Sequence, residues 1–235
     1  MDGLALVDAH AGYGSVEVLH GTTILAPNGT VTALVGRNGA GKSSVMRCFA
    51  GLLALRAGAL QWDGRDVTAL SPSERARAGM TVVPDERGIF PGLTVEENLR
   101  LFAGREPLDA APVERALEVF PELRRHLDQP AGTMSGGERQ MLALSRIFVR
   151  PGRAVLVDEL SRGLSRDATA RCYSALAELA RADRALVVVE QYVDDVLRIA
   201  GLVYVLTRGA VTFAGEPGEL SAGVAGSEGW RGQGL

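Results

Sequence analysis

The sequence predicts an α/β fold built around a parallel sheet, and two observations carry that prediction. Three short apolar runs, rich in Val and Leu, have the length of strands that helices bury on both faces: 31–35, 154–157 and 185–189. Between the runs lie segments with helix start signals, among them two capping boxes, Ser71-Pro-Ser-Glu74 and Thr94-Val-Glu-Glu97. Strands that alternate with helices in this way are typical of a parallel sheet covered by helices.

The chain before the first parallel strand predicts a different layer. Short extended pieces at 4–7 and 15–19 are bounded by turn residues, namely Gly14, Gly21 and Pro27-Asn-Gly29. We therefore expect an antiparallel β layer beside the parallel core.

Three later regions complete the predicted fold. The stretch 94–150 contains no convincing strand and predicts several helices, the clearest with Met141, Leu144 and Phe148 on one face. The runs 202–206 and 211–213 are separated by a Gly-containing turn and predict a hairpin. The Gly-rich end from Ser221 has little to order it, so we expect a peripheral tail over about 221–235.

Composition and charge exclude several function classes. The chain has 235 residues, 46% of them hydrophobic and 23% charged, which predicts one soluble catalytic module with a substantial core. A net charge of −3 gives no electrostatic footprint of nucleic-acid binding. The two cysteines, Cys48 and Cys172, have no metal-type spacing and favour a reducing cytoplasm. Without a secretory signal pattern or about 18 consecutive apolar residues, we expect no membrane span.

A Gly-rich stretch directly after the run 31–35 has the pattern of a phosphate-binding loop that opens a helix. Glycines let successive backbone N–H groups point at phosphates, and the helix N-terminus adds its positive dipole end. Lys42 should reach the β and γ phosphates, and the Ser43 hydroxyl should bind Mg²⁺. The predicted nucleotide-binding residues here are Gly36, Asn38, Gly39, Ala40, Gly41, Lys42, Ser43 and Ser44.

Two carboxylates, Asp158 and Glu159, follow the apolar run 154–157. Open α/β sheets bind their ligands at this end of the strands, so a phosphate-bound metal would lie here. We expect Asp158 to serve Mg²⁺, and Glu159 to orient or deprotonate the attacking water. Without the phosphate loop upstream, two surface acids at a strand end would be the better interpretation.

Ser135-Gly-Gly137-Glu138 opens the helix that carries Met141 and Phe148. Ser135 and Glu138 form a capping box, which could start a helix in any protein. Capping alone does not explain the two glycines in the first turn. They need an explanation because each costs about 1 kcal/mol of helix stability relative to Ala. Bare backbone at a helix N-terminus can approach an anion closely, so we favour contact with phosphate.

In this order, the phosphate loop, Ser135-Gly-Gly137 and Asp158-Glu159 resemble the ATP-binding cassette family over nearly the whole chain. The resemblance implies a P-loop ATPase of that type with a RecA-like core, an antiparallel β layer and a helical subdomain over about 88–150. It also implies that Ser135, Gly136 and Gly137 contact ATP held by the phosphate loop of a second cassette. Catalysis would then require a dimer.

The resemblance also implies that Tyr13, in Gly-Tyr-Gly ahead of the first parallel strand, stacks on adenine. A lone Tyr beside a turn is otherwise often a packing residue.

Less universal positions resemble the second ATPase of bacterial branched-chain amino-acid importers, through stretches at 81–99, 131–137 and 188–191. Most cassettes have Gln where Asp85 stands and His where Gln191 stands, whereas an acidic residue and Gln are usual in this subfamily. The resemblance implies that Asp85 lies near the metal and the attacking water. Gln191 can donate an amide hydrogen to the γ-phosphate but cannot carry a proton.

The subfamily implies an energy-coupling subunit that is cytoplasmic and peripheral on the inner face of the membrane. It would pair with itself or with a second cassette ATPase, and would dock transmembrane permease subunits through the segment 85–101. A substrate-binding protein would be contacted only indirectly.

Two departures from the family pattern leave alternatives open. Leu160 stands where the family usually has Pro, and Ser165 where it usually has an Asp at the dimer contact. A weakly hydrolytic ATP-gated switch therefore stays possible, and a urea or amide importer ATPase of the same lineage would fit the motifs equally. A P-loop kinase or GTPase has no use for Ser135-Gly-Gly137 across a dimer. Repair cassettes would show a long coiled coil and translation cassettes would show two cassettes in one chain. The sequence has neither feature, so both classes are disfavoured.

Overall fold

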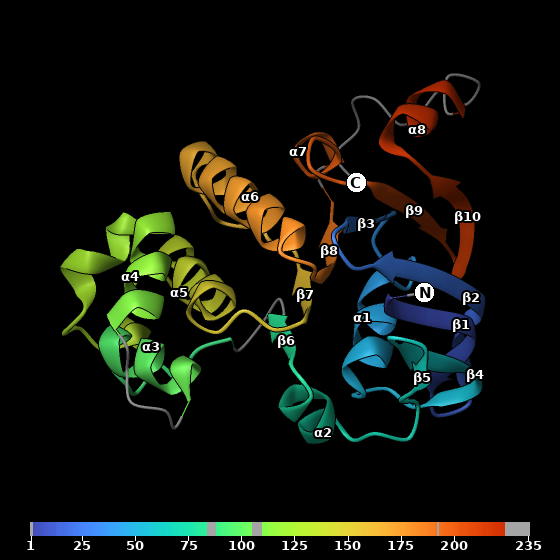
Figure 1. Ribbon diagram of the computed structural model, residues 1–235, viewed down its shortest axis with the longest axis horizontal. Helices are drawn as coiled ribbons and strands as arrows, with labels where there is room; N and C mark the ends of the chain where they lie inside the picture. Colours follow the sequence, from blue (N-terminus) through green and yellow to red (C-terminus); the bar gives the residue numbers. More distant parts are fainter. Residues whose placement is uncertain (1, 84–87, 105–109, 192, 224–235) are drawn as a thin grey trace.

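The computed structural model describes residues 2–83, 88–104, 110–191 and 193–223. Its strands form two sheets (Figure 1). One sheet is antiparallel, with strand order β2-β1-β4-β5, and comprises β1 (Gly3–Tyr13), β2 (Val16–Pro27), β4 (Leu55–Trp62) and β5 (Arg65–Asp66). The predicted antiparallel layer is therefore present, and its strands are longer than the pieces at 4–7 and 15–19.

The second sheet has the strand order β10-β9-β3-β8-β7-β6 and is parallel except for its edge strand β10. Its strands are β3 (Val31–Val35), β6 (Met80–Val83), β7 (Ala154–Asp158), β8 (Ala185–Glu190), β9 (Leu202–Thr207) and β10 (Ala210–Gly215). The three predicted runs are β3, β7 and β8, and the predicted hairpin is β9–β10. The predicted α/β class with a parallel core is confirmed.

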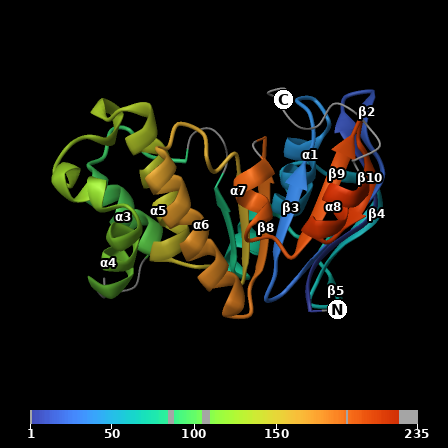
Figure 2. The same cartoon turned by 90° about the horizontal axis from the view of Figure 1, so that it is seen from above.

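Helices cover the parallel sheet on both faces (Figure 2). On one face, α1 (Lys42–Ala50) packs between the two sheets, where Val45 and Phe49 are fully buried. On the other face lie α5 (Gly136–Val149) and α6 (Arg166–Arg181), and α3 (Val95–Ala103) and α4 (Ala110–Val119) pack on α5 farther from the sheet. Because both faces are covered, every residue of β3, β7 and β8 is buried, as parallel strands require.

The remaining helices are short. They are α2 (Pro72–Arg77), the 3-10 turns η1 (Pro121–His126) and η2 (Ala131–Thr133), α7 (Val193–Leu197) and α8 (Pro217–Gly223). Residues 221–223, predicted as the start of a peripheral tail, lie in α8, and the rest of that predicted tail, 224–235, lies outside the described residues. Within the described part of the chain, no helix is both long and apolar enough to cross a membrane.

All three predicted capping boxes are present. Ser71, Thr94 and Ser135 are the N-caps of α2, α3 and α5, and each side chain accepts a hydrogen bond from the backbone N–H three residues on. The Glu at that third position accepts in return from the N-cap backbone N–H. Local sequence therefore determines where these helices begin.

A buried arginine caps the opposite end of α1. Arg75 is 4% exposed, and its guanidinium donates to the carbonyls of Cys48 and Phe49 at 2.7 and 2.8 Å. It also bonds the carbonyls of Thr68 and Leu70. Positive charge is favourable at a helix C-terminus, so Arg75 fixes the helix that begins at the phosphate loop.

The strand order brings the predicted site together. In the order β3, β8, β7, β6, four neighbouring parallel strands end at the same edge of the sheet. The phosphate loop follows β3, Gln191 follows β8, and Glu159 follows β7. The carboxyl edge of this sheet is where α/β proteins bind ligands.

Candidate functional site

The phosphate loop joins β3 to α1, and close packing explains two of its glycines. A Cβ at Gly36 would lie 2.3 Å from the Leu206 carbonyl oxygen, and φ at this residue is 153°. Gly41 is the N-cap of α1 with φ 107°, a conformation that residues with a Cβ rarely adopt. Gly39 also has positive φ but borders open space. The loop therefore packs closely against Leu206 at Gly36 and borders open space at Gly39.

Lys42 is the first residue of α1 and lies under the loop. Its side chain is 6% exposed, and Nζ donates to the carbonyls of Gly36 at 2.6 Å and Arg37 at 3.2 Å. Burial lowers the Lys42 pKa, and the carboxylates of Asp158 and Glu159 oppose that shift. The ammonium therefore lies in a poorly solvated place where an added anion would stabilise it.

The residues predicted to bind Mg²⁺ differ in their exposure. Ser43 is exposed at the start of α1, whereas Asp158 ends β7 and is 8% exposed. A hydroxyl and a carboxylate at one sheet edge are the oxygen ligands that Mg²⁺ uses together with phosphate oxygens and water. Ser43 and Asp158 therefore fit the metal. Asp85, also predicted as a metal and catalytic residue, lies outside the described residues.

Glu159 adopts an unusual backbone conformation. Its φ is 50°, in the left-handed region, which costs a residue with a Cβ about 1–2 kcal/mol. The backbone is held there from both sides, since Glu159 N donates to Val189 O at 3.0 Å and Gln140 Nε2 donates to Glu159 O at 3.3 Å. Strain at a residue that its surroundings hold in place is characteristic of functional sites.

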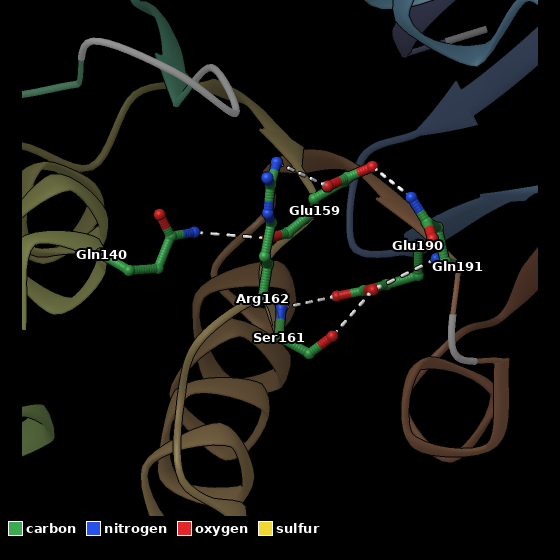
Figure 3. A network of polar contacts seen from close by, with 6 residues as sticks. All are labelled: Gln140, Glu159, Ser161, Arg162, Glu190 and Gln191. Carbon is green, nitrogen blue, oxygen red and sulfur yellow. Dashed lines mark hydrogen bonds and ion pairs between the residues drawn. The ribbon is translucent and has the colours of Figure 1, made fainter. Parts of the chain in front are cut away.

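Among the described residues, the Glu159 carboxylate has two partners, shown in Figure 3. Gln191 Nε2 donates to Oε1 at 2.5 Å, and the Arg162 guanidinium forms an ion pair with Oε2 at 3.3 Å. Because β8 lies between β3 and β7, Gln191 is placed between the phosphate loop and Glu159. Glu159, predicted to act on the attacking water, is therefore in direct contact with Gln191, predicted to donate to the γ-phosphate.

Sequence reasoning missed three residues around this contact. Gln140 bonds the Glu159 backbone, Arg162 bonds its carboxylate, and Glu190 lies buried beside Gln191. Glu190 had a visible signal, since it ends an apolar run in the same way that Asp158 and Glu159 do. Gln140 had none, because its contact depends on how α5 packs beside β7. Arg162 is only three residues from Glu159, and that spacing of opposite charges was the signal that could have found it.

Arg146, on α5, connects this helix to both ends of the segment that carries Asp85. Its guanidinium donates to Val82 O at 3.3 Å and to Gly88 O at 2.9 Å. It also lies over the Phe102 ring, with Cζ 4.5 Å from the ring centroid. The helix that begins at Ser135 therefore holds the chain on either side of the predicted metal-side residue.

The two glycines after Ser135 have different surroundings. A Cβ at Gly137 would lie 2.5 Å from the Gly163 carbonyl oxygen, whereas a Cβ at Gly136 would meet no atom within 4 Å. Packing within the chain therefore explains Gly137 and leaves Gly136 unexplained. The first turn of α5 lies on the other face of the sheet from α1, so one chain does not bring the Ser135 motif over its own Lys42 (Figure 2).

This difference predicts opposite effects for two alanine substitutions. Gly137→Ala is expected to lower the melting temperature, because the new methyl group must displace the segment around Gly163. Gly136→Ala is expected to leave the melting temperature within about 2 °C, since Ala also favours the helix. Differential scanning fluorimetry of both variants checks this, and equal shifts would contradict it. If Gly136 serves a bound anion, Gly136→Ala still lowers ATP hydrolysis.

Tyr13 lies at the end of β1 over the first turn of α1. It is 44% exposed, and its hydroxyl accepts a hydrogen bond from Arg47 Nη1 at 2.8 Å and lies 3.5 Å from Ser44 Oγ. The Arg47 guanidinium is 5.8 Å from the ring centroid. The ring is therefore anchored at its hydroxyl end beside the phosphate-loop helix, with part of its surface free to stack.

The structure gives both departures from the family pattern a role. Leu160 is fully buried in the core formed with α5 and α6. Ser165 is the N-cap of α6, where its hydroxyl accepts from Ala168 N at 3.3 Å. Neither change disturbs the Glu159–Gln191 contact.

Known proteins similar to this chain belong to the family that its motifs resemble. Residues 19–162, more than half of the chain, match the family model described as ABC transporter. A high-affinity branched-chain amino acid transport ATP-binding protein, BraG of Pseudomonas aeruginosa, is 34% identical over 202 residues, which cover 85% of this chain and 86% of that protein. A probable branched-chain amino acid transport ATP-binding protein, LivF of Archaeoglobus fulgidus, is 35% identical over 221 residues, covering 92% and 93%.

A solved structure of the ATP binding subunit of an ABC transporter has the same fold. Its TM-score is 0.83 at 24% identity, covering 96% of this chain and 95% of that one. The phosphate loop, the strand-end carboxylates and the similar proteins all indicate the same family. The chain belongs to the ABC transporter family and is one of its ATP-binding, ATP-hydrolysing cassettes.

Proposed function

We propose that the chain is the subunit that hydrolyses Mg-ATP to power an importer of branched-chain amino acids. The observation that carries the catalytic part is the direct contact of Gln191 Nε2 with Glu159 Oε1, beside the phosphate loop. It supports the proposal because Gln191 follows β8, the strand between β3, which leads into the phosphate loop, and β7, which ends at Asp158 beside Glu159.

ATP binding uses the loop 36–44 and Lys42. Loop N–H groups and the N-terminus of α1 supply donors for the phosphates. Lys42 exchanges its carbonyl partners, Gly36 and Arg37, for the β and γ phosphates, which favours binding because charge-assisted hydrogen bonds are stronger than neutral ones. Tyr13 stacks on adenine. The exposed Ser43 and the strand-end Asp158 would hold Mg²⁺, with Asp85 as a further proposed ligand, and bound Mg²⁺ would supply charge stabilisation to the transferring phosphate.

Glu159 accepts the proton of the attacking water. Gln191 keeps one amide hydrogen on Glu159 Oε1 and directs the other toward the γ-phosphate, since an amide has two donors. Gln191 thus aligns the base without exchanging a proton itself. General-base catalysis of this kind contributes about 10²–10⁴-fold in rate.

A second cassette completes the site. Gly136 borders open space in this chain, which supports the proposal that Ser135, Gly136 and Gly137 bind the γ-phosphate of a partner's ATP. The partner is a second copy or a related ATPase. ATP closes the dimer and hydrolysis reopens it.

The membrane partner docks on the segment 85–101, which places the protein on the inner face of the cell membrane. Phe90 and Leu101 support this assignment, because both are large apolar side chains that are 48% and 49% exposed. Asn98, fully buried, holds this surface in shape by bonding Phe90 N and O. Transmembrane permease subunits would cover these side chains. A substrate-binding protein acts only through the permeases, and nucleic acid has no part.

The names of BraG and LivF support branched-chain amino acids as the transported substrate. Importers of other solutes are also among the chain's relatives, and a urea or amide importer of the same lineage is the alternative. Reconstituting the chain in proteoliposomes with permease subunits of a branched-chain amino-acid importer and their binding protein tests the assignment. Leucine-loaded binding protein is expected to stimulate ATP hydrolysis, and stimulation by urea alone would replace the proposed substrate.

Removing Mg²⁺ is expected to stop hydrolysis completely. Because Ser43 and Asp158 would hold Mg²⁺ against the phosphates, chelation by excess EDTA should leave the phosphate charge unneutralised. A phosphate-release assay should fall to background in EDTA and recover when Mg²⁺ is restored. Hydrolysis that persists in EDTA would exclude the proposed metal site.

A further inference from the structure

The strongest unexplained feature of the site is a buried carboxylate beside Gln191. Glu190 is the last residue of β8 and is 1% exposed. Four donors converge on it: the Ser161 N–H at 2.8 Å, the Ser161 hydroxyl at 2.9 Å, the Tyr173 hydroxyl at 2.8 Å and the Gln191 N–H at 3.3 Å. Figure 3 shows Glu190 between Ser161 and Gln191.

The donors are distributed so that only a carboxylate satisfies them. Oε1 accepts the Ser161 N–H and the Tyr173 hydroxyl, and Oε2 accepts the Gln191 N–H and the Ser161 hydroxyl. A hydroxyl can rotate to accept instead of donating, but a backbone N–H cannot. Since each oxygen takes one backbone N–H, an amide at this position would turn its NH₂ group toward a fixed donor.

The carboxylate is retained against a cost. Burial raises the Glu190 pKa, and its four hydrogen bonds only partly offset that shift. Burial and the Glu190 carboxylate together raise the Tyr173 pKa, so its hydroxyl remains a proton donor. An apolar residue would avoid this penalty but would leave the Ser161 and Gln191 N–H groups without this acceptor, so the carboxylate serves to join these two backbone segments.

The contacts of Glu190 complete a closed ring of covalent and hydrogen bonds that includes Glu159. From Glu159 the chain runs two residues to Ser161, which bonds Glu190, and Glu190 precedes Gln191, whose side chain returns to Glu159 Oε1. The segment Leu160–Ser165 is thereby tied to the Gln191 amide through one side chain. Further along, Gly163 contacts Gly137 of the Ser135 motif.

We propose that Glu190 is a positioning residue for ATP hydrolysis, which clamps the backbone of Ser161 to that of Gln191 and so sets the Gln191 amide on Glu159. This inference rests on the proposed roles of Glu159 and Gln191. The clamp transmits the position of the segment Leu160–Ser165, which packs on the Ser135 motif, to the base at the chain's own ATP.

Steady-state kinetics of purified variants test the clamp. Glu190→Gln is expected to lower kcat by about tenfold or more, the effect of losing a hydrogen bond to a charged group, while KM for ATP stays within about twofold. Glu190→Asp keeps the charge but is one methylene too short to span both backbone donors, and should lower kcat similarly. Tyr173→Phe leaves both backbone bonds in place, so its kcat should stay within about threefold of wild type.

A stability control separates positioning from packing. Val188→Ala removes buried apolar volume from the same strand without touching the polar ring. If Val188→Ala lowers the melting temperature as much as the Glu190 variants do, it should still keep the wild-type kcat. The clamp is refuted if Glu190→Gln or Glu190→Asp hydrolyses ATP at the wild-type rate, if KM rises as much as kcat falls, or if Val188→Ala loses equal kcat.

The Glu159→Gln variant distinguishes this inference from the function beneath it. Active wild type, inactive Glu159→Gln and fully active Glu190 variants would refute the clamp alone. Equal hydrolysis by wild type and Glu159→Gln would refute both proposals.

Discussion

Glu159→Gln is expected to lower the rate of ATP hydrolysis by about 10²-fold or more, which abolishes it in practice, while ATP-dependent dimerisation survives. Gln has the shape of Glu but cannot accept a proton from water. It can still bond Gln191, because its amide oxygen can face Nε2. The loss of the ion pair with Arg162, which is 63% exposed, should affect stability little. Phosphate release measures the rate, and size-exclusion chromatography with Mg-ATP measures the dimer.

A matched control is available on α6. Glu178→Gln removes one carboxylate charge at an exposed position and should hydrolyse ATP like wild type. Wild-type turnover as low as that of Glu159→Gln would instead indicate an ATP-gated switch that barely hydrolyses. The buried packing of Leu160 and the capping role of Ser165 argue against that outcome, because both departures serve the fold.

Lys42→Met is expected to remove the stabilisation by Mg-ATP without destabilising the nucleotide-free protein. Burial holds the Lys42 pKa below its unfolded value, so at neutral pH the charged ammonium costs folding free energy, a cost that disappears only as pH rises through its pKa. Met fills a similar volume without that charge. A ligand at a hundredfold excess over Kd stabilises by about 2.7 kcal/mol, which raises Tm by about 5–10 °C here.

Thermal melts with and without Mg-ATP check this prediction. Wild type should show the nucleotide-dependent rise in Tm, and Lys42→Met should show none while its nucleotide-free Tm stays within about 3 °C. Arg65→Met, which removes an exposed cation from β5, serves as the control and should keep the full rise. A nucleotide-dependent rise in Lys42→Met equal to that of wild type would move the phosphate contact to other groups.

The fold was predictable where one local rule decides the structure. The strands β3, β7 and β8 are continuous apolar runs because both of their faces are buried, and the capping boxes mark three helix starts. The strand β6 was missed, since Met80–Val83 is four residues long and directly precedes Pro84. β4 was missed because Arg56, Gly58 and Gln61 interrupt its apolar pattern, and its pairing with β1 is a long-range contact.

For the site, predictability followed sequence distance. The phosphate loop and the Asp158-Glu159 pair are contiguous motifs whose chemistry can be read directly. The ring through Glu190 joins residues 161, 173 and 190 and arises only when β7, α6 and β8 pack together. The conformation of Glu159 was equally hidden, because neighbouring elements rather than its own preference impose the positive φ. The roles of Asp85 and of the dimer stay predictions.

The contact between Gly137 and Gly163 also determines which experiments can detect it. Both positions already lack a side chain, so the backbone of α5 touches the segment after Glu159 with nothing between them. An alanine scan, which finds important residues by trimming them, has nothing to trim here and would pass over the contact. Only a scan that adds atoms can reveal it, and a paired enlargement at both positions should be worse than either alone.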